Sequence, residues 1–319
     1  MSSPKTYLIT GTTSGIGLAL VQHLLSQSQN VIATGRNIVS RFPSDLVTSH
    51  PDNLKLLELD IASPLPHLQS IAAQAWDLFP GGIDVLFNNA GMSAMKPFEE
   101  ASEEYISQIY TVNLFGPMRL TQAFLPLFRN NRKGVTIAFT SSSSTYTPLP
   151  FMSHYSASKS ALSTTITSLA KELLPFHISV LAFECGGTVT NLGQPRQSSP
   201  SPSPSSSSLL SSPPPPQETP YAQGITSLIT MFTRDPPAYM PGSPSKMAKT
   251  MVSVINKIQK GEKVPVRLVL GSDAWESVNQ NLDETQQVLQ EWKHVSWGTD
   301  RDGVKGGAEG DYLRAVSIL

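Results

Sequence analysis

Cysteine is almost absent from this sequence, since Cys185 is the one thiol in 319 residues. A single thiol excludes intrachain disulfides and every metal site that needs several cysteines. The six histidines lie scattered along the chain without the close spacing of metal ligands, so no bound metal is expected. We expect Cys185 itself to be a buried, unreactive thiol.

The sequence also has no excess of charge and no long hydrophobic run. It contains 23 Lys and Arg against 24 Asp and Glu, so no basic field is available to bind nucleic acid or anionic lipid. No apolar run approaches the roughly 18 residues that span a bilayer, and the apolar segment Tyr7–Thr10 begins too early for a signal peptide. We therefore expect a cytoplasmic protein with no nucleic-acid partner and no membrane span.

The first 190 residues alternate short β-rich segments with helical patterns whose period is near 3.6 residues. This alternation predicts an α/β fold, a single doubly wound parallel sheet of about seven strands, Rossmann-like, with helices on both faces. Helices are expected at Ile16–Leu25, Glu103–Leu114, Ser156–Leu174, Lys246–Lys260 and Ala274–Trp292. Strands are expected at Tyr7–Thr10, Val31–Thr34, Leu54–Leu59, Val85–Phe87, Val135–Phe139, Ile178–Phe183 and Pro265–Leu270.

Three glycines, Gly11, Gly15 and Gly17, lie between the first expected strand and the first expected helix. Glycine there lets the backbone turn sharply, so that a pyrophosphate can approach the free N–H groups at the positive end of the helix. The spacing G-x-x-x-G-x-G therefore indicates a dinucleotide site. The alternative is a tight strand-to-helix turn with no ligand, which would need the same glycines.

The residues after the second expected strand bear on which dinucleotide would bind. An acidic residue at this point accepts the ribose 2′-hydroxyl of NAD, but this sequence has Gly35, Arg36 and Asn37 there. The Arg36 guanidinium can pair with a 2′-phosphate, which favours NADP; the alternative is a solvated loop arginine. Asp60, at the end of the third strand, is either an acceptor for the adenine amino group or a helix N-cap.

Four polar residues form a candidate catalytic group. Tyr155 and Lys159 lie four residues apart, on one face of an expected helix, and Ser142 follows the fifth expected strand, where ligand sites form in open α/β sheets. Asn113 is a polar residue inside an otherwise apolar helix. The alternatives are a surface Tyr–Lys pair, and an asparagine that bonds its own helix backbone.

Together these motifs resemble those of the short-chain dehydrogenases/reductases. They occur in that family's order and spacing over about residues 5 to 192, and the later helices and the 265–270 strand resemble the family's C-terminal part. Chance does not plausibly supply six motifs in register. The six are Thr10–Gly17, Asn88-Asn89-Ala90-Gly91, Asn113, Ser142, Tyr155-x-x-x-Lys159 and Gly186–Thr190.

The resemblance implies an NADP-dependent oxidoreductase, a carbonyl reductase or alcohol dehydrogenase. Tyr155 would protonate a carbonyl oxygen, its pKa lowered from about 10 by the nearby Lys159 ammonium. Ser142 would orient the substrate oxygen, and Asn113 would kink its helix and hold a water that links Lys159 to solvent. The implied cofactor-binding residues are Gly11, Thr13, Ser14, Gly15, Ile16, Gly17, Arg36, Asp60, Asn89, Tyr155, Lys159, Thr188 and Thr190.

The sequence departs from the family pattern at one point and says little about the substrate. The family has Pro-Gly where this sequence has Cys185-Gly186, so we expect a looser turn beside Thr188. Substrate contacts are expected from residues 92–95 and 147–152 and from the loop after Thr190. Residues 148–152 are apolar and uncharged, which favours a hydrophobic ketone, aldehyde or secondary alcohol, although plain packing would need the same composition.

Two other functions are compatible with the sequence. A lyase or epimerase on the same cofactor fold would return the hydride, and a non-enzymatic NADP(H)-binding regulator would bind without turnover. The presence of both Tyr155 and Lys159 counts against the regulator. The resemblance also implies a homodimer through Glu103–Phe128 and Ser156–Leu174, with support from a charge-poor face on the second segment. That face would comprise Ser163, Thr164, Thr165, Thr167 and Ser168.

Composition divides the chain into four stretches. Residues 1–193 would be the dinucleotide-binding and catalytic core, and residues 221–297 the C-terminal part of the same domain. Between them, 19 of the 27 residues 194–220 are Ser or Pro, which predicts a disordered insertion in the substrate-loop region because it has little apolar surface to bury. Residues 298–319 are expected to be a flexible tail.

Deleting Ser198 to Pro216 should lower the thermal midpoint by less than about 5 °C. The reason is that this segment should bury little, and the entropy of loop closure changes slowly with loop length. Thermal unfolding of the full chain and the deletion variant measures this. A larger fall would contradict the prediction, since about 1 kcal/mol moves a domain of this size by only about 2–4 °C.

Overall fold

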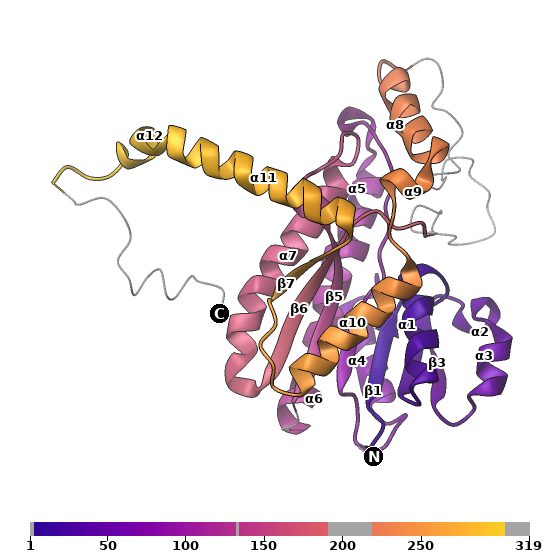
Figure 1. Ribbon diagram of the computed structural model, residues 1–319. Coiled ribbons are helices and arrows are strands. Elements are labelled where there is room, and N and C mark those ends of the chain that lie inside the picture. The colour runs from indigo at the N-terminus through magenta and orange to yellow at the C-terminus, as the bar shows by residue number, and fades with distance from the viewer. Residues whose placement is uncertain (1–2, 132–133, 191–218, 304–319) are drawn as a thin grey trace.

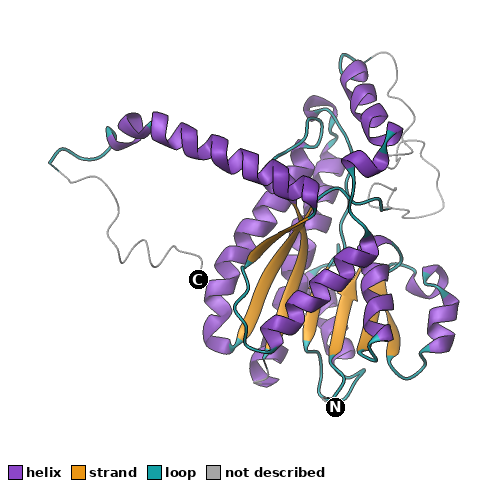
Figure 2. Ribbon diagram, viewed as in Figure 1, coloured by secondary structure: helices purple, strands orange, loops and turns teal. Residues whose placement is uncertain are grey.

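The computed structural model describes residues 3–131, 134–190 and 219–303. Its centre is one parallel sheet of seven strands in the order β3-β2-β1-β4-β5-β6-β7 (Figures 1 and 2). The sheet confirms the predicted fold class and places every strand where the sequence predicted one, to within a few residues. The strands are β1 (Thr6–Thr10), β2 (Asn30–Gly35), β3 (Leu54–Glu58), β4 (Val85–Asn88), β5 (Val135–Ser142), β6 (Ile178–Cys185) and β7 (Arg267–Leu270).

Helices cover both faces of the sheet, so parallel strands such as β1 are buried along their whole length. One apolar layer packs α4 (Leu65–Trp76), α6 (Gly116–Asn131) and α7 (Ser153–Leu173) against one face. The other packs α1 (Gly15–Ser26) and α10 (Pro244–Gln259) against the opposite face. The long helices therefore fix the sheet from two sides and leave its strand ends to form the site.

Shorter elements connect these layers. The helix predicted at Glu103–Leu114 is instead an α-helix followed by a π-helical turn, and α7 begins at Ser153, three residues before its predicted start. It ends at Leu173, two residues before Pro175, which cannot donate the backbone bond that would continue it. The remaining elements are α2 (Ile38–Arg41), α3 (Ser44–Ser49), η1 (Phe98–Glu100), α5 (Glu103–Tyr110), η2 (Thr111–Phe115), η3 (Ser143–Thr145), η4 (Leu174–Phe176), α8 (Ala222–Arg234), α9 (Pro236–Tyr239), α11 (Ser272–Glu291) and α12 (Lys293–Trp297).

The strand order reverses direction between β1 and β4, because the chain winds from β1 outward to β3 and then crosses back to β4. In doubly wound sheets such a reversal opens a crevice at the carboxyl ends of the two strands. The glycine turn follows β1, Asn89 follows β4, and Ser142 ends β5, so the predicted site residues converge there.

Parts of the predicted organisation fall outside the described residues. Of the predicted insertion 194–220, the structure describes Thr219 and Pro220, and of the predicted tail 298–319 it describes residues 298–303. Both segments therefore stay predictions. Across the described ranges, no helix combines the length and the hydrophobicity that crossing a membrane would require.

Candidate active site

The glycine turn after β1 is held to the ends of β4 and β5 by Asn89. The Asn89 side-chain amide donates to the carbonyl of Thr10 at 2.9 Å, and its Oδ1 accepts from Thr140 Oγ1 at 3.1 Å. The backbone N–H groups of Asn89 and Ala90 both donate to Thr10 Oγ1, each at 2.9 Å. Asn89 thus joins the ends of β1, β4 and β5, and its predicted contact with a cofactor stays a prediction.

The glycines of the turn meet the steric demands of a dinucleotide cradle. Gly11 and Gly15 have φ values of +71° and +57°, which side chains with a Cβ rarely adopt. A Cβ at Gly17 would collide with the carbonyl of Gly11. Ser14, the N-cap of α1, makes no capping hydrogen bond with its side chain to any described residue, so the first-turn N–H groups suit an anionic ligand.

Thr13 and Ile16 flank this turn in different ways. Thr13 lies beside the end of β2, where its Cγ2 would be 3.5 Å from a Cβ built on Gly35. Ile16 packs its side chain partly against the apolar layer of α1 and α10. Both residues lie at the glycine turn, and Ile16 also anchors this turn to the apolar core.

Arg36 is half-buried in the turn between β2 and α2, at the edge of the crevice. The conformation of this turn depends on Glu58, whose carboxylate accepts from the backbone N–H groups of Asn37 at 2.6 Å and Ile38 at 3.0 Å. Asn37 has a positive φ of 51°, so the turn is a sharp one. Glu58 was not singled out by the sequence, because its contacts cross from one strand to the next.

Asp60 follows β3 and lies on the same side of the crevice. Its Oδ1 accepts from the backbone N–H of Ala62 at 2.9 Å. The next helix, α4, begins only at Leu65 with Pro64 as its N-cap, so the interpretation of Asp60 as a helix N-cap is wrong. Asp60 instead closes a local turn of its own chain, which fixes the orientation of its carboxyl group.

Asn113 is completely buried in the π-helical turn η2 and ties together three parts of the site. Its Nδ2 donates to the carbonyl of Met92 at 2.9 Å and to Ser158 Oγ at 3.1 Å, while its Oδ1 accepts from the Met92 N–H at 2.9 Å. The side chain therefore bonds across to the β4 loop and to α7. The alternative in which it bonds its own helix is wrong, and the π-turn lies where a kink was expected.

The structure brings Tyr155, Ser142 and Lys159 together. All three are at least nine-tenths buried, and the Ser142 side chain lies close enough to Tyr155 to act on its pKa. The Lys159 Nζ donates to the carbonyl of Thr140 at 2.9 Å, two residues before Ser142 on β5. The surface-pair alternative for Tyr155 and Lys159 is therefore wrong.

Burial governs the proton affinities of this group. It raises the pKa of Tyr155 to about 12, and the hydrogen bond with Ser142 acts in the opposite direction. It also lowers the pKa of Lys159 to about 8. The expectation that Lys159 lowers the pKa of Tyr155 below 10 is thus wrong for the free protein, because desolvation penalises the charged form of each side chain.

The loop after β6 is held by Asp273 at the start of α11. The Gly187 N–H donates to Asp273 Oδ2 at 2.6 Å, and a Cβ at Gly186 would collide with the same carboxylate. The looser turn expected from Cys185 in place of proline is therefore compensated by a carboxylate clamp. Cys185 is buried, and burial raises the pKa of its thiol to about 12, which agrees with an unreactive thiol.

Thr188 and Thr190 continue this loop toward the glycine turn. Thr188 pairs with Gly242 in a short parallel bridge, and its Oγ1 donates to the Gly186 carbonyl at 3.3 Å. The side chain of Thr190 would lie 3.2 Å from a Cβ at Gly15, so it borders the turn after β1. The loop thus closes the crevice from the β6 side.

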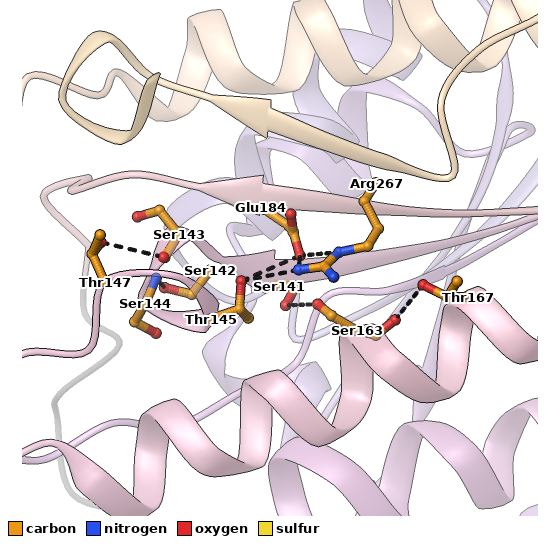
Figure 3. Close-up of polar contacts among 10 residues, drawn as sticks. All are labelled: Ser141, Ser142, Ser143, Ser144, Thr145, Thr147, Ser163, Thr167, Glu184 and Arg267. Atoms are coloured by element: carbon orange, nitrogen blue, oxygen red, sulfur yellow. Dashed lines mark hydrogen bonds and ion pairs between the residues drawn. The ribbon is translucent and has the colours of Figure 1, made fainter. Parts of the chain in front are cut away.

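A buried ion pair supports the segment that follows Ser142 (Figure 3). Glu184 is fully buried, and its Oε1 accepts from Arg267 Nη2 at 2.6 Å and Nε at 2.8 Å. Thr145 Oγ1 lies between both partners, at 3.4 Å from Glu184 and 3.3 Å from Arg267. The Arg267 guanidinium also stacks over Tyr146, 4.7 Å from the ring centre. The pair therefore anchors η3 to β6 and β7.

The far side of Tyr155 is apolar. Buried Ile109 and Met152 pack with Tyr155, and Met92 and Met95 pack partly against them. The neighbouring Phe151 has a positive φ of 62°, and its ring lies edge-on to Tyr221, 6.0 Å between centres. Met92, Met95 and Met152, from two of the three segments predicted to contact substrate, thus lie near Tyr155, while the loop after Thr190 falls outside the described residues.

Besides Glu58, sequence reasoning missed four residues that shape this site: Thr140, Ser158, Glu184 and Asp273. Ser158 lies between Tyr155 and Lys159, and its Oγ donates to the Tyr155 carbonyl at 2.7 Å, so its position in the motif was an available signal. The other three act through contacts with residues 19 to 86 positions away. Nothing in the local pattern indicates such pairings.

Comparison with known proteins agrees with this architecture. The family model for short chain dehydrogenases matches residues 5–201. Human 17-beta-hydroxysteroid dehydrogenase type 1 is 36% identical over 186 residues, 56% of this chain and 55% of that protein. Human retinol dehydrogenase 8 is 32% identical over 194 residues, 59% of this chain and 60% of that protein. The chain therefore spans little more than half the length of these two relatives.

A solved short-chain dehydrogenase from Streptomyces avermitilis is similar over nearly the whole chain. It is 32% identical, with a TM-score of 0.76, and the match covers 94% of this chain and all of that one. The parallel sheet, the glycine turn and the Asn-Ser-Tyr-Lys group together define one class of α/β protein. This chain belongs to the short-chain dehydrogenase family of oxidoreductases.

Replacing Arg267 by methionine should lower the free energy of unfolding by about 3–5 kcal/mol, because it leaves the fully buried Glu184 carboxylate without its cation. Urea unfolding measures the loss. The double variant Glu184→Leu, Arg267→Met removes both charges and should recover most of the stability. If the free energy of unfolding of Arg267→Met stays within about 1 kcal/mol of that of the unaltered protein, the Glu184–Arg267 pair does not anchor this edge of the sheet.

Proposed function

We propose that this protein is an NADP-dependent carbonyl reductase or alcohol dehydrogenase. It would transfer a hydride between NADPH and a hydrophobic ketone or aldehyde, or act in reverse on the secondary alcohol. The observation that carries the proposal is the burial of Tyr155, Ser142 and Lys159 together at the carboxyl end of β5, where Lys159 bonds the carbonyl of Thr140. Family membership agrees with this chemistry.

In reduction, Tyr155 is the proton donor. Its raised pKa keeps the phenol neutral at physiological pH, so the proton is in place for the carbonyl oxygen. The Ser142 hydroxyl, which lies near Tyr155, donates to the same oxygen and orients it. Bound NADPH supplies the hydride to the carbonyl carbon, and the apolar side chains near Tyr155 exclude water from the reacting atoms.

Lys159 stabilises the phenolate left on Tyr155 and restores its proton. With a pKa of about 8 it is mostly protonated at neutral pH, yet close enough to neutrality to give up a proton. It also binds the nicotinamide ribose. Asn113 positions Lys159 through Ser158, the residue before it, and holds the water that connects Lys159 to solvent.

The glycine turn and Arg36 would hold the rest of the cofactor. Gly11, Gly15 and Gly17 leave room for the pyrophosphate at the α1 N-terminus, and Arg36 pairs with the 2′-phosphate. Asp60 accepts from the adenine amino group and Asn89 borders its ribose. On the nicotinamide side, Thr188 and Thr190 contact the carboxamide and pyrophosphate, from a loop that Asp273 holds in place.

NADPH should bind at least about tenfold more tightly than NADH, a difference of about 1.4 kcal/mol, because Arg36 can pair with the 2′-phosphate. Arg36→Ala should abolish the difference while leaving NADH affinity nearly unchanged. Both dissociation constants can be measured by titration of nucleotide fluorescence. Equal affinities for the two nucleotides in the unaltered protein would remove the NADP assignment.

The substrate class follows from the lining of the site. Met92, Met95 and Met152 provide an adaptable apolar surface next to Tyr155, which suits an apolar substrate. The names of two relatives, a hydroxysteroid dehydrogenase and a retinol dehydrogenase, refer to hydrophobic alcohols. A bulky apolar ketone or alcohol is therefore the proposed substrate.

Tyr155→Phe should reduce turnover of an apolar ketone at least about 1000-fold, because the ring stays but the transferable proton is lost, and NADPH affinity should change little. Tyr7→Phe is the matched control, since Tyr7 is also buried with a pKa raised to about 12 but lies on β1. NADPH absorbance measures the rate. A Tyr155→Phe enzyme that keeps most of its turnover would falsify the proposed acid.

The same assay separates the rival functions. A reductase consumes one NADPH for each ketone, a lyase or epimerase converts its substrate without net consumption, and a regulator binds NADPH without converting anything. Lys159→Ala adds a second test, because it should weaken both NADPH binding and turnover. Unchanged NADPH binding in Lys159→Ala would contradict its proposed contact with the ribose.

We also propose a homodimer through the helices of residues 103–128 and α7. Thr164 and Ser168 are exposed on α7, whereas Ser163 is fully buried against Ser141 at 2.8 Å, so Ser163 does not belong to the predicted face. Thr165 and Thr167 donate to carbonyls of their own helix. The proposed location is the cytoplasm, whose reducing conditions suit a free Cys185 thiol.

The α7 interface predicts that the double variant Thr164→Lys, Ser168→Glu weakens association through this face. Both side chains are exposed, so the fold should be unaffected, while the larger charged groups block close helix contact. Light scattering at micromolar concentration gives the mass. An unaltered protein with the mass of one 34.5 kDa chain would contradict the interface.

A further inference from the structure

The C-terminal helices α11 and α12 carry an uncovered apolar surface. Helix α11 leaves the sheet after β7 and extends beyond the rest of the molecule (Figure 1). Ala274 and Val278, near its start, are buried. The large apolar side chains that follow the same helices are 51–63% exposed: Trp275, Leu282, Val288, Leu289, Trp292 and Trp297.

These residues have the spacing of a helix-pairing seam. Trp275, Val278, Leu282, Thr285, Leu289 and Trp292 are separated by alternating steps of three and four, which is a heptad repeat over about two and a half heptads. We call these six residues the apolar stripe. Within the stripe Val278 packs against its own domain, whereas Trp275 and every member from Leu282 onward are exposed. Most of the stripe therefore has no apolar surface of the described residues packed against it.

Charge is confined to the opposite side of α11. Its carboxylates, Asp273, Glu276, Asp283, Glu284 and Glu291, all fall outside the stripe at 100° per residue. The positions that flank the exposed part of the stripe are Asn281, Gln286 and Val288, which are uncharged. Pairing along the stripe would therefore bring no like charges into contact.

We propose that the apolar stripe is an interface for a second copy of this chain, in which two α11 helices pair antiparallel. In an antiparallel pair the two helices run in opposite directions, so the heptad positions of one helix meet those of the other in reverse order. Leu282 then lies opposite the partner's Trp292, and Thr285 lies opposite the partner's Leu289. Antiparallel helices also align their dipoles favourably. The domains then lie at opposite ends of a helix about 30 Å long, which keeps them apart.

Charge argues for a protein partner over a lipid surface. Helices that lie on membranes carry lysine and arginine on their polar face, and anionic headgroups repel carboxylates. The polar face of α11 has five carboxylates, and Lys293 at the start of α12 is the nearest lysine. A second copy of the chain would present the same uncharged apolar stripe, so the two stripes could pack against each other.

The size of the surface fits an interface that forms at micromolar concentration. Three of the chain's four tryptophans, Trp275, Trp292 and Trp297, lie on these two helices. Half-exposed side chains of this size together present on the order of several hundred Å² of apolar surface, comparable with the largest patches on monomers, which often mark interaction sites. This interface is separate from the α7 face and rests on no step of the proposed reaction.

The test uses the full chain carrying Thr164→Lys and Ser168→Glu, so that the α7 face does not contribute. Light scattering across a concentration series should show two-chain particles in this background. Adding Leu282→Glu and Leu289→Glu should raise the dissociation constant at least about 100-fold. The matched control adds the same charges on the opposite face, as Gln280→Glu and Gln287→Glu, and should keep the dimer.

Tryptophan emission reports on the same surface, because three of the four tryptophans lie there. Dilution dissociates the dimer of the control, so its tryptophan emission should shift to longer wavelength. The Leu282→Glu, Leu289→Glu variant should emit at this longer wavelength at every concentration. Glutamate favours helix and both leucines are exposed, so circular dichroism should be unchanged.

Three results would overturn the proposal. One is a mass–concentration curve that is the same for the stripe variant and the control. Another is binding to phosphatidylcholine vesicles that the stripe variant loses, which would make a membrane the partner. The third is the mass of one chain together with short-wavelength tryptophan emission that moves to longer wavelength when residues 304–319 are removed. That result would mean that the chain's own C-terminal residues cover the apolar stripe.

Discussion

The site depends on one residue of β5, Thr140, which joins the two halves of the molecule. Its carbonyl accepts from Lys159 on α7, and its hydroxyl donates to Asn89 at the end of β4. Asn89 in turn holds the glycine turn after β1. Because a single threonine links both, the proposed proton-transfer group and the proposed cofactor cradle keep a constant relative position.

Burial then sets the chemistry of that group. Tyr155 and Lys159 are buried between α7 and the sheet, and desolvation moves their pKa values in opposite directions, to about 12 and about 8. Each shift favours the neutral form. The result is a phenol that keeps its proton at neutral pH, as the proposed reduction requires of its acid.

Secondary supports hold the loops around this centre. Asp273 clamps the Gly187 N–H after β6, and the Glu184–Arg267 pair anchors the segment after Ser142. Both supports come from the C-terminal part of the chain, β7 and α11. The same α11 then continues outward with its apolar stripe, so the helix that steadies the loop also carries the proposed interface between copies.

The sequence by itself determined the strands, most helices and the choice of Asn113, Ser142, Tyr155 and Lys159 as the candidate catalytic group. Periodicity and short motifs are local properties, so they can be read without the fold. It did not determine the direction of the Tyr155 pKa shift, the burial of Ser163, the role of Asp60 in its own turn, or the contacts of Thr140, Glu184 and Asp273. Desolvation and partners many residues away decided most of these. Both exist only once the sheet and its helices have packed, which is why tertiary structure alone could supply them.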